Sequence, residues 1–246
     1  MAWPLIATVA AFVFDISFLA SIPIFFGPLL ALLAFLARRA FVRSVLFAIV
    51  IAISVTTIID TIAHASGAWI AKSAFPYRIL GLAPWEDVIL GVFLVTSILL
   101  YYEWHVQHHR SFPLVAARWR RFIVFIGLLI AAVVFAWLWD PESLIFSDAF
   151  LKLGLFSILL PCVLELSRHH ALTGKFARTA LYWTYVLFLY ELAGVYNFWW
   201  HFPSDDYVGW IQIMNIGFPL EEFVFWIAGA SLAMLAYYEF FLDDGR

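Results

Sequence analysis

Long apolar runs separated by short charged segments constrain this chain more than any other feature. Residues 3–37 contain one charged side chain, Asp15, and six further apolar runs follow. An α-helix needs about 20 apolar residues to cross the hydrocarbon core of a bilayer. The sequence is 65% hydrophobic and 13% charged, with a mean hydropathy of +0.95. This composition excludes a soluble domain and predicts an integral membrane protein.

We therefore predict an all-α integral membrane protein, a single transmembrane domain over residues 1–246 with seven membrane-spanning helices. Pro23 and Gly27–Pro28 are expected to kink the first helix. The amino terminus lacks the basic segment of a signal peptide, so we expect it to be retained. The predicted spans cover about 13–37, 42–63, 85–104, 122–139, 149–166, 179–199 and 219–242.

One short motif opens two of these spans: a proline, any residue, a glutamate and a second acid. It reads Pro84-Trp85-Glu86-Asp87 at the third span and Pro219-Leu220-Glu221-Glu222 at the seventh. Acids in the first turn of a helix complement the helix dipole and are ordinary when they occur singly. Carboxylates at membrane depth are costly unless they are paired or protonated, so two copies indicate a functional site.

The similarity between the two regions extends beyond the motif. Asp60 and Trp69 precede the first copy with the same mutual spacing that Glu191 and Trp200 show before the second. We therefore predict two parallel three-helix repeats joined by a linking helix. The repeats cover about 13–104 and 149–242 and the linking helix about 122–139, and the copies close with Tyr101-Tyr102-Glu103-Trp104 and Tyr237-Tyr238-Glu239-Phe240.

Arginine and lysine collect on one side of the predicted bundle, and the other side has only Lys72, Arg78 and Lys152. By the positive-inside rule the richer side is cytoplasmic. This places the protein in the cell membrane with its amino terminus outside, its carboxyl terminus in the cytoplasm and both motifs near the outer face. The richer side carries Arg38, Arg39, Arg43, Arg110, Arg118, Arg120, Arg121, Arg168, Lys175, Arg178 and Arg246.

The duplicated motif, with an acid and a tryptophan upstream of each copy, resembles that of the membrane-integral lycopene cyclases of archaea, actinobacteria and fungi. In that family the two repeats are separate subunits or are fused, and this chain resembles the fused form over nearly its whole length. The resemblance implies closure of the linear end groups of lycopene to ionone rings, β expected and ε left open, with no metal or cofactor. The implied partners are lycopene from the bilayer and membrane lipid, not nucleic acid; homo-oligomers and contacts with other carotenoid enzymes stay open.

The chemistry of ring closure fits these residues. It requires a proton on the terminal double bond, attack of a neighbouring double bond on the resulting cation, and loss of a different proton. A carboxyl group kept protonated by a dry site can supply the first proton, and a second carboxylate can receive the other. The expected catalytic residues are Glu86, Asp87, Glu221 and Glu222, with Glu86 and Glu221 the first candidates.

Other residues are expected to bind the substrate or to tune the protonation of the motif acids. Aromatic faces stabilise a passing carbocation by roughly 2 kcal/mol when desolvated. A buried acid on a neighbouring helix can relay protons or be structural, and both interpretations stay open. The residues concerned are Asp60, Glu191, Trp69, Trp85, Trp200, Phe223, Phe225 and Trp226.

Four other functions compete with this interpretation. A carotenoid hydratase starts with the same protonation but lets water capture the cation. A di-iron hydroxylase would use histidine boxes, which His105-Val106-Gln107-His108-His109 and His169-His170 suggest, but their number is too small. A retinal protein needs a lysine in its last span, and a prenyl-transfer enzyme needs paired aspartate-rich boxes; the chain has neither.

Overall fold

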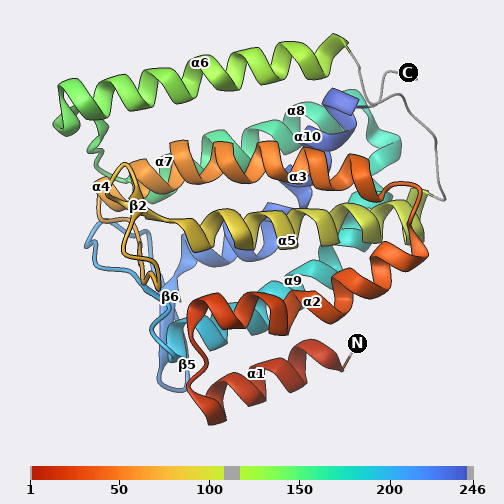
Figure 1. Ribbon diagram of the computed structural model, residues 1–246, viewed down its shortest axis with the longest axis horizontal. Helices are drawn as coiled ribbons and strands as arrows, with labels where there is room; N and C mark the ends of the chain where they lie inside the picture. Colours follow the sequence, from red (N-terminus) through yellow and green to blue (C-terminus); the bar gives the residue numbers. More distant parts are fainter. Residues whose placement is uncertain (1, 108–116, 243–246) are drawn as a thin grey trace.

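The chain folds into long helices that lie side by side, with short strands gathered at one end (Figure 1). The computed structural model describes residues 2–107 and 117–242. The helical elements are α1 (Trp3–Phe14), α2 (Phe18–Leu36), α3 (Phe41–Val55), η1 (Thr56–Asp60), α4 (Thr61–Ala65), α5 (Trp85–Tyr101), η2 (Tyr102–Gln107), α6 (Ala117–Trp139), η3 (Pro141–Leu144), α7 (Ala149–Gly154), η4 (Leu155–Leu159), α8 (Leu160–Arg168), η5 (His170–Leu172), α9 (Thr173–Tyr196), η6 (Glu222–Gly229) and α10 (Ala230–Leu242). The strands are β1 (Ile70–Ala71), β2 (Arg78–Ile79), β3 (Ala83–Pro84), β4 (Trp200–His201), β5 (Trp210–Ile213) and β6 (Ile216–Pro219).

Six helices in the described part of the chain are long and apolar enough to cross a membrane. Helix α9 has 24 residues, which is sufficient length, but its less apolar sequence keeps it out of this set. These helices are those of an α-helical membrane protein, as the sequence predicted, and the seventh span stays a prediction. The six are Phe18–Leu36, Phe41–Ala65, Trp85–Val106, Arg118–Trp139, Ala149–Arg168 and Glu222–Phe241.

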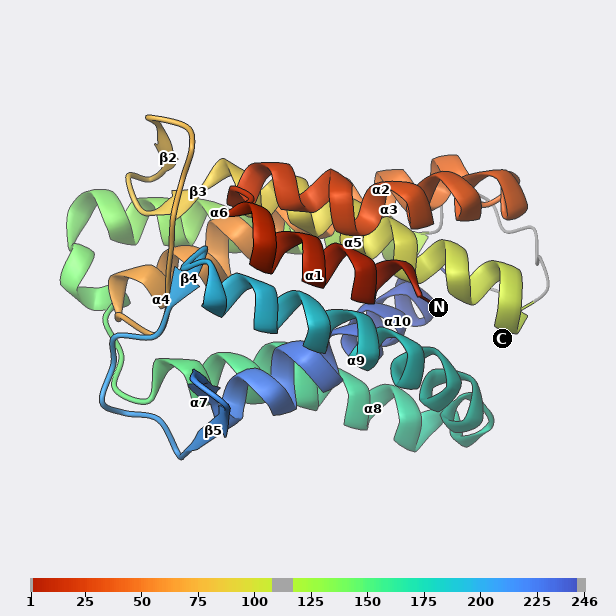
Figure 2. The same cartoon turned by 90° about the horizontal axis from the view of Figure 1, so that it is seen from below.

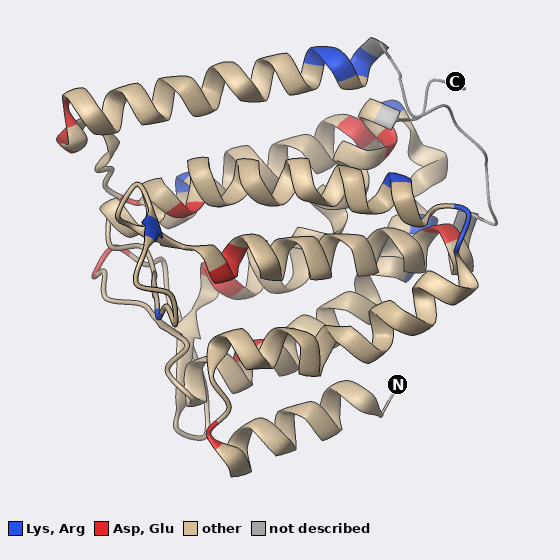
Figure 3. Cartoon of the chain, viewed as in Figure 1, with Lys and Arg blue, Asp and Glu red and all other residues tan. Residues whose placement is uncertain are grey.

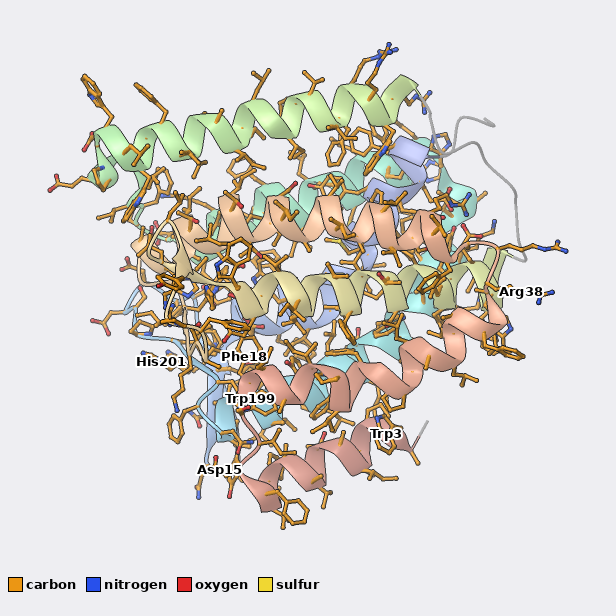
Figure 4. The ribbon with its side chains drawn as sticks, in the orientation of Figure 1. Trp3, Asp15, Phe18, Arg38, Trp199 and His201 are labelled. Carbon is orange, nitrogen blue, oxygen red and sulfur yellow. The ribbon has the colours of Figure 1, made fainter. Side chains whose placement is uncertain are left out.

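The predicted start of the first span, at about residue 13, is wrong. Asp15 adopts a left-handed backbone with φ of 46°, and Ser17 caps the helix that begins at Phe18. The long apolar run is therefore divided at its polar residues, whereas Pro23 and Pro28 lie inside α2. Helix α1 turns back beside α2 and α9 (Figures 2 and 4), and the Trp3 indole donates to the carbonyl of Ile24 at 2.8 Å.

The loops at the strand end contain three antiparallel two-stranded ladders that an all-α prediction omits. Two of them are hairpins, β2–β3 and β5–β6, and each hairpin ends at the proline of a motif. Pro84 has the extended backbone of a strand, with φ of −74° and ψ of 148°, and α5 begins at the next residue. The hairpins thus deliver both acidic motifs directly to the start of a helix.

The third ladder joins the two regions of the chain to each other. Strands β1 and β4 pair antiparallel, with Ile70 opposite His201 and Ala71 opposite Trp200. The Lys72 N–H donates to the carbonyl of Trp199 at 2.7 Å and extends the pairing. This ladder closes the strand end of the bundle between α4 and α9.

The hydrophobic core is largely aromatic. Trp183, Trp199, Phe25 and Phe26 are at most 2% exposed, and such rings contribute large buried areas in well-defined geometries. Helices α3 and α5 approach closely through small residues: a Cβ added at Gly91 would lie 2.8 Å from that of Ala52. Small side chains permit such close approach in membrane proteins, where van der Waals packing holds helices together.

Most lysine and arginine residues of the described chain lie at the end of the bundle opposite the strands (Figure 3). Buried there are two Tyr–Glu pairs that connect α5–η2 to α10. The Tyr102 hydroxyl donates to Glu239, and the Tyr238 hydroxyl donates to Glu103 at 2.6 Å. Arg43 forms an ion pair with Glu103, and all five side chains are at most 8% exposed. Breaking one member of such a buried network leaves an uncompensated polar group, which is costly.

We expect Tyr238→Phe to destabilise the protein by about 1–3 kcal/mol, because Glu103 loses a donor in a buried site. Thermal unfolding in detergent, followed by circular dichroism, measures the change. The control is Tyr77→Phe, since Tyr77 is 79% exposed in the loop before β2. Equal midpoints for the two variants would contradict a stabilising role for this pair.

Candidate functional site

A cavity of about 200 Å³ lies between the helices beneath the β1–β4 ladder. Four carboxylic side chains line it near the ladder: Asp60, Asp87, Glu191 and Glu222. Away from the acids, its walls are apolar side chains of α3, α5 and α10. The lining residues are Ile51, Ala52, Val55, Thr56, Asp60, Trp69, Ala71, Asp87, Leu90, Gly91, Leu94, Val95, Ile98, Leu187, Tyr190, Glu191, Trp200, Phe202, Glu222, Trp226, Ile227, Ala230 and Met234.

The second acid of each motif faces this cavity, whereas the first acid faces the loops. Adjacent positions of a helix point about 100° apart, so the two acids of a pair point in different directions. Asp87 and Glu222 line the cavity and are partly accessible; Glu86 and Glu221 do not line it and are 0% and 2% exposed. The structure therefore separates the two members of each predicted catalytic pair.

Glu86 anchors the loop that follows β1. Its carboxylate accepts hydrogen bonds from the Ser73 hydroxyl at 3.0 Å, from the Phe75 N–H at 3.3 Å and from the Ala74 N–H. Donors that converge on a carboxylate form strong, charge-assisted bonds. Glu86 is thus the hub of a buried loop turn, apart from the cavity.

Glu221 makes the corresponding contact in the second region. Its Oε1 accepts a hydrogen bond from the Val208 N–H at 2.6 Å, and the neighbouring Leu220 N–H donates to the Gly209 carbonyl at 2.8 Å. Both first acids therefore hold the loop segment about a dozen residues upstream. The expectation that Glu86 and Glu221 are the first catalytic candidates loses its geometric basis, because neither lines the cavity.

Each cavity-facing motif acid lies beside an acid from another helix, as the shared spacing suggested. Asp87 interacts electrostatically with Asp60, whose carboxylate is hydrogen-bonded by Thr56. Glu222 is hydrogen-bonded to Glu191, which also accepts a bond from the Trp200 indole at 2.9 Å. Asp60 ends the π-helical turn η1, and Glu222 begins the π-helical turn η6. Such turns are frequent at functional sites.

Tyr190 lies between the two acid pairs. It is within electrostatic range of both Asp87 and Glu191, and its hydroxyl is 3.0 Å from that of Ser21. Sequence reasoning missed Tyr190, and it also missed Thr56, Phe202 and Met234. Nothing distinguishes these residues from the many other aromatic and apolar side chains of the spans, because only the fold shows which of them face the cavity.

Three of the predicted aromatic residues line the cavity, namely Trp69, Trp200 and Trp226. Trp69 and Trp226 meet edge to face with centroids 5.5 Å apart. The other three do not line it: Trp85 is 47% exposed on the outside, and Phe223 and Phe225 point elsewhere. Phe225 packs against Gly154, where a Cβ would lie 2.1 Å from the ring.

Loop contacts hold the ladder over the cavity. His64 donates from Nδ1 to the Asp60 carbonyl at 2.7 Å and accepts the Ala71 N–H at Nε2, which ties the end of α4 to β1. Tyr207 donates its hydroxyl to the Ala68 carbonyl at 2.9 Å. Burial raises the pKa of Tyr207 to about 12, so this loop phenol stays protonated at neutral pH and keeps its donor role.

The described residues contain no group of three or more histidine, cysteine, aspartate or glutamate side chains arranged to hold a metal ion. His105 lies in η2, at the end of the bundle opposite the cavity. The remaining members of that predicted histidine box, His108 and His109, lie outside the described residues.

Comparison with known proteins adds no family: no family model, no curated protein and no solved structure matches the chain. The geometry defines the site by itself. It is a carboxyl-rich, aromatic-walled and otherwise apolar cavity inside a helical membrane protein.

Gly194 permits the Trp200–Glu191 contact, because a Cβ at this position would lie 2.1 Å from the Trp200 ring. We expect Gly194→Ala to displace the ring and to destabilise the protein by about 1–3 kcal/mol. The unfolding midpoint in detergent and the near-ultraviolet circular dichroism of tryptophan measure this effect. Gly174→Ala on the same helix is the matched control, since nothing lies within 4 Å of its Cβ position. Identical behaviour of the two variants would show that Trp200 does not depend on this close approach.

Proposed function

We propose that this chain is a lycopene cyclase, which closes the linear end group of lycopene by a redox-neutral proton transfer. The observation that carries the proposal is the convergence of four carboxylic side chains and three tryptophans on one otherwise apolar cavity. An apolar wall suits a hydrocarbon chain, and a water-poor site strengthens the electrostatic effects of the acids. Asp87 and Glu222 are the catalytic residues of this proposal.

The reaction needs groups that the cavity holds. A protonated carboxyl group gives its proton to the terminal double bond, and the adjacent double bond attacks the cation to close the ring. A carboxylate then takes a proton from the carbon next to the new cation, which gives an ionone ring. Trp69, Trp200 and Trp226 line the cavity, and a desolvated cation–π contact stabilises the intermediate cation by roughly 2 kcal/mol. The ring expected is the β form.

We further propose seven spans, with α9 as the sixth, arranged as two three-helix repeats about an axis along the membrane normal and joined by α6. The β1–β4 ladder supports this arrangement, because its central residues, Ile70 and His201, each directly follow one of the matched tryptophans. The reciprocal pairs Tyr102–Glu239 and Tyr238–Glu103 support it at the opposite end. A two-fold axis requires such mutual contacts between equivalent residues.

The distribution of charge supports an orientation in the cell membrane. The arginine-rich end opposite the cavity (Figure 3) is assigned to the cytoplasm. The acids and the ladder then lie near the outer face, and a substrate dissolved in the bilayer enters between helices. The sequence predicted that the amino-terminal segment would precede the first span on the outer side. In the structure the chain turns at Asp15, and α1 packs beside α2 and α9.

The deciding experiment is expression in a lycopene-accumulating host followed by chromatography of the pigments. We expect the natural chain to produce cyclic carotenoids, and we expect Glu222→Gln to lower their formation about 100-fold or more, because an amide cannot deliver a proton. Glu86→Gln keeps an acceptor oxygen for the Ser73 turn and should retain much more activity. Glu142→Gln, at an exposed position, is the control.

Unchanged lycopene with a folded natural chain would refute the cyclase assignment. End groups that carry a hydroxyl in place of a ring would identify a hydratase instead. If folded Glu86→Gln and Glu222→Gln lost cyclic carotenoid formation equally, lining the cavity would not be what makes an acid of the motif catalytic.

Treatment with a chelator tests the di-iron alternative. We expect purified protein in lipid to convert the substrate at an unchanged rate after dialysis against a chelator and in the absence of oxygen, because proton transfer requires neither. The rate of product formation before and after dialysis is the measurement. Activity that returns only with iron would favour a hydroxylase.

A further inference from the structure

The two acid pairs of the cavity differ in their surroundings. Glu191 and Glu222 are hydrogen-bonded to each other, and the Trp200 indole donates to Glu191 at 2.9 Å. A hydrogen bond between two carboxyl groups requires a proton on one of them, because two carboxylates have only acceptors. Two carboxyl groups that share an apolar site behave in this way in other enzymes, where one proton serves both. The Glu191–Glu222 pair is therefore suited to sharing one proton.

The Asp60–Asp87 pair lies near a fixed positive charge. Arg78 donates to the carbonyl of Leu82 at 2.6 Å and to that of Ala71 at 2.8 Å. These two bonds hold the guanidinium within electrostatic range of Asp87. Arginine stays charged in proteins, so Arg78 favours the ionised form of Asp87, against burial and the neighbouring carboxyl groups of Asp60 and Glu86, which oppose it. Asp60 accepts a further hydrogen bond from Thr56.

The matching hairpin lacks this charge. In β2–β3 the residue opposite the motif proline Pro84 is Arg78, whereas in β5–β6 the residue opposite Pro219 is Trp210. At the same position of the register, the first hairpin therefore carries a cation and the second carries a half-exposed indole. Tyr190 is within electrostatic range of both Asp87 and Glu191, and all three residues line the cavity. The Asp60–Asp87 and Glu191–Glu222 pairs therefore face the same region of the cavity.

We propose that the two pairs have separate tasks: Glu191–Glu222 donates the proton that starts ring closure, and Asp60–Asp87, with Arg78, accepts the proton that ends it. This assignment rests on the proposed cyclase function. Glu222 and Asp87 act on the substrate, and Arg78, Asp60 and Glu191 are positioning residues.

The step balances without an oxidant or reductant. The O–H bond of the donor pair breaks, and the π electrons of the terminal double bond form a C–H bond at its inner carbon, which leaves the cation on the outer, more substituted carbon. The π electrons of a neighbouring double bond then form the C–C bond that closes the ring. A C–H bond next to the cation then breaks, its electron pair forms the ring double bond, and the proton moves to the Asp87 carboxylate. Exchange with water returns one proton to the donor pair and removes one from the acceptor pair before the next turnover.

Infrared spectroscopy tests the shared proton without any substrate. The measurement is a difference spectrum of protein in detergent, in which the spectrum of a variant is subtracted from that of the natural chain. For Glu191→Gln and for Glu222→Gln, the difference should contain the C=O stretch of a protonated carboxylic acid. This band should shift in D₂O. Asp87→Asn should leave that band in place. A band that persists in both glutamate variants, or that Asp87→Asn removes, overturns the assignment even if the chain acts on a different polyene.

Product analysis in the lycopene-containing host tests the second half. Glu191→Gln and Glu222→Gln should leave lycopene unconsumed, about 100-fold or more below the natural chain. Asp87→Asn and Arg78→Gln should still consume lycopene, but a larger share of the product should be hydrated end groups or rings with a displaced double bond. Arg78→Lys, which keeps the charge, should restore part of the normal product pattern.

The reverse pattern, with unconsumed lycopene in Asp87→Asn and altered products in Glu222→Gln, would reverse the donor and the acceptor. An equal loss of lycopene consumption in all variants that circular dichroism shows to be folded would refute separate tasks for the two pairs. Failure of the cyclase assignment has a different signature, since the natural chain would then leave lycopene unchanged while the infrared result still stood.

Discussion

The structure depends on how it compensates carboxylic side chains inside an apolar bundle. An unpaired carboxylate at membrane depth costs several kcal/mol, so every buried acid needs donors, a counter-charge or a proton. The described residues supply donors and a counter-charge, and in our proposal one pair also shares a proton. Glu86 and Glu221 accept hydrogen bonds from the loops, and Glu103 forms an ion pair with Arg43 and accepts a hydrogen bond from Tyr238. Glu191 and Glu222 contact each other.

The two acids of each motif illustrate this compensation at adjacent positions. The hairpin places the motif proline at the last position of a strand, and the helix that follows turns one acid towards the loop and the next towards the cavity. The first acid thereby fixes the loops that support the ladder, and the ladder covers the cavity that the second acid lines. Structural and chemical requirements are met by neighbouring residues of the same type.

Sequence reasoning identified the helices because hydropathy and length determine them, and it located the acids because charges are rare in apolar runs. It paired Asp60 and Glu191 with the motifs through their spacing from Trp69 and Trp200, and the structure brings all four acids of these pairs to one cavity. It favoured Glu86 over Asp87, whereas Asp87 lines the cavity, because the orientation of the two acids depends on the loop N–H groups that converge on Glu86. The break at Asp15 was missed because Pro23 and Pro28 are the stronger local signals, although α2 accommodates both. Tyr190 resembles every other aromatic residue of the spans until the fold shows its neighbours.

The crossed tyrosine–glutamate pairs have a consequence for how a bundle of this kind arises. Tyr102 bonds the glutamate that follows Tyr238, and Tyr238 bonds the glutamate that follows Tyr102. A half-length chain carrying only one such Tyr-Glu segment would have to bond the glutamate of a second, identical copy, which is the isologous contact of a symmetric homodimer. Under the proposed two-repeat arrangement, fusion of two such genes would turn that contact between subunits into one within a chain. Each proposed copy would then be released from the requirement to be identical, so one hairpin could carry arginine where the other carries tryptophan.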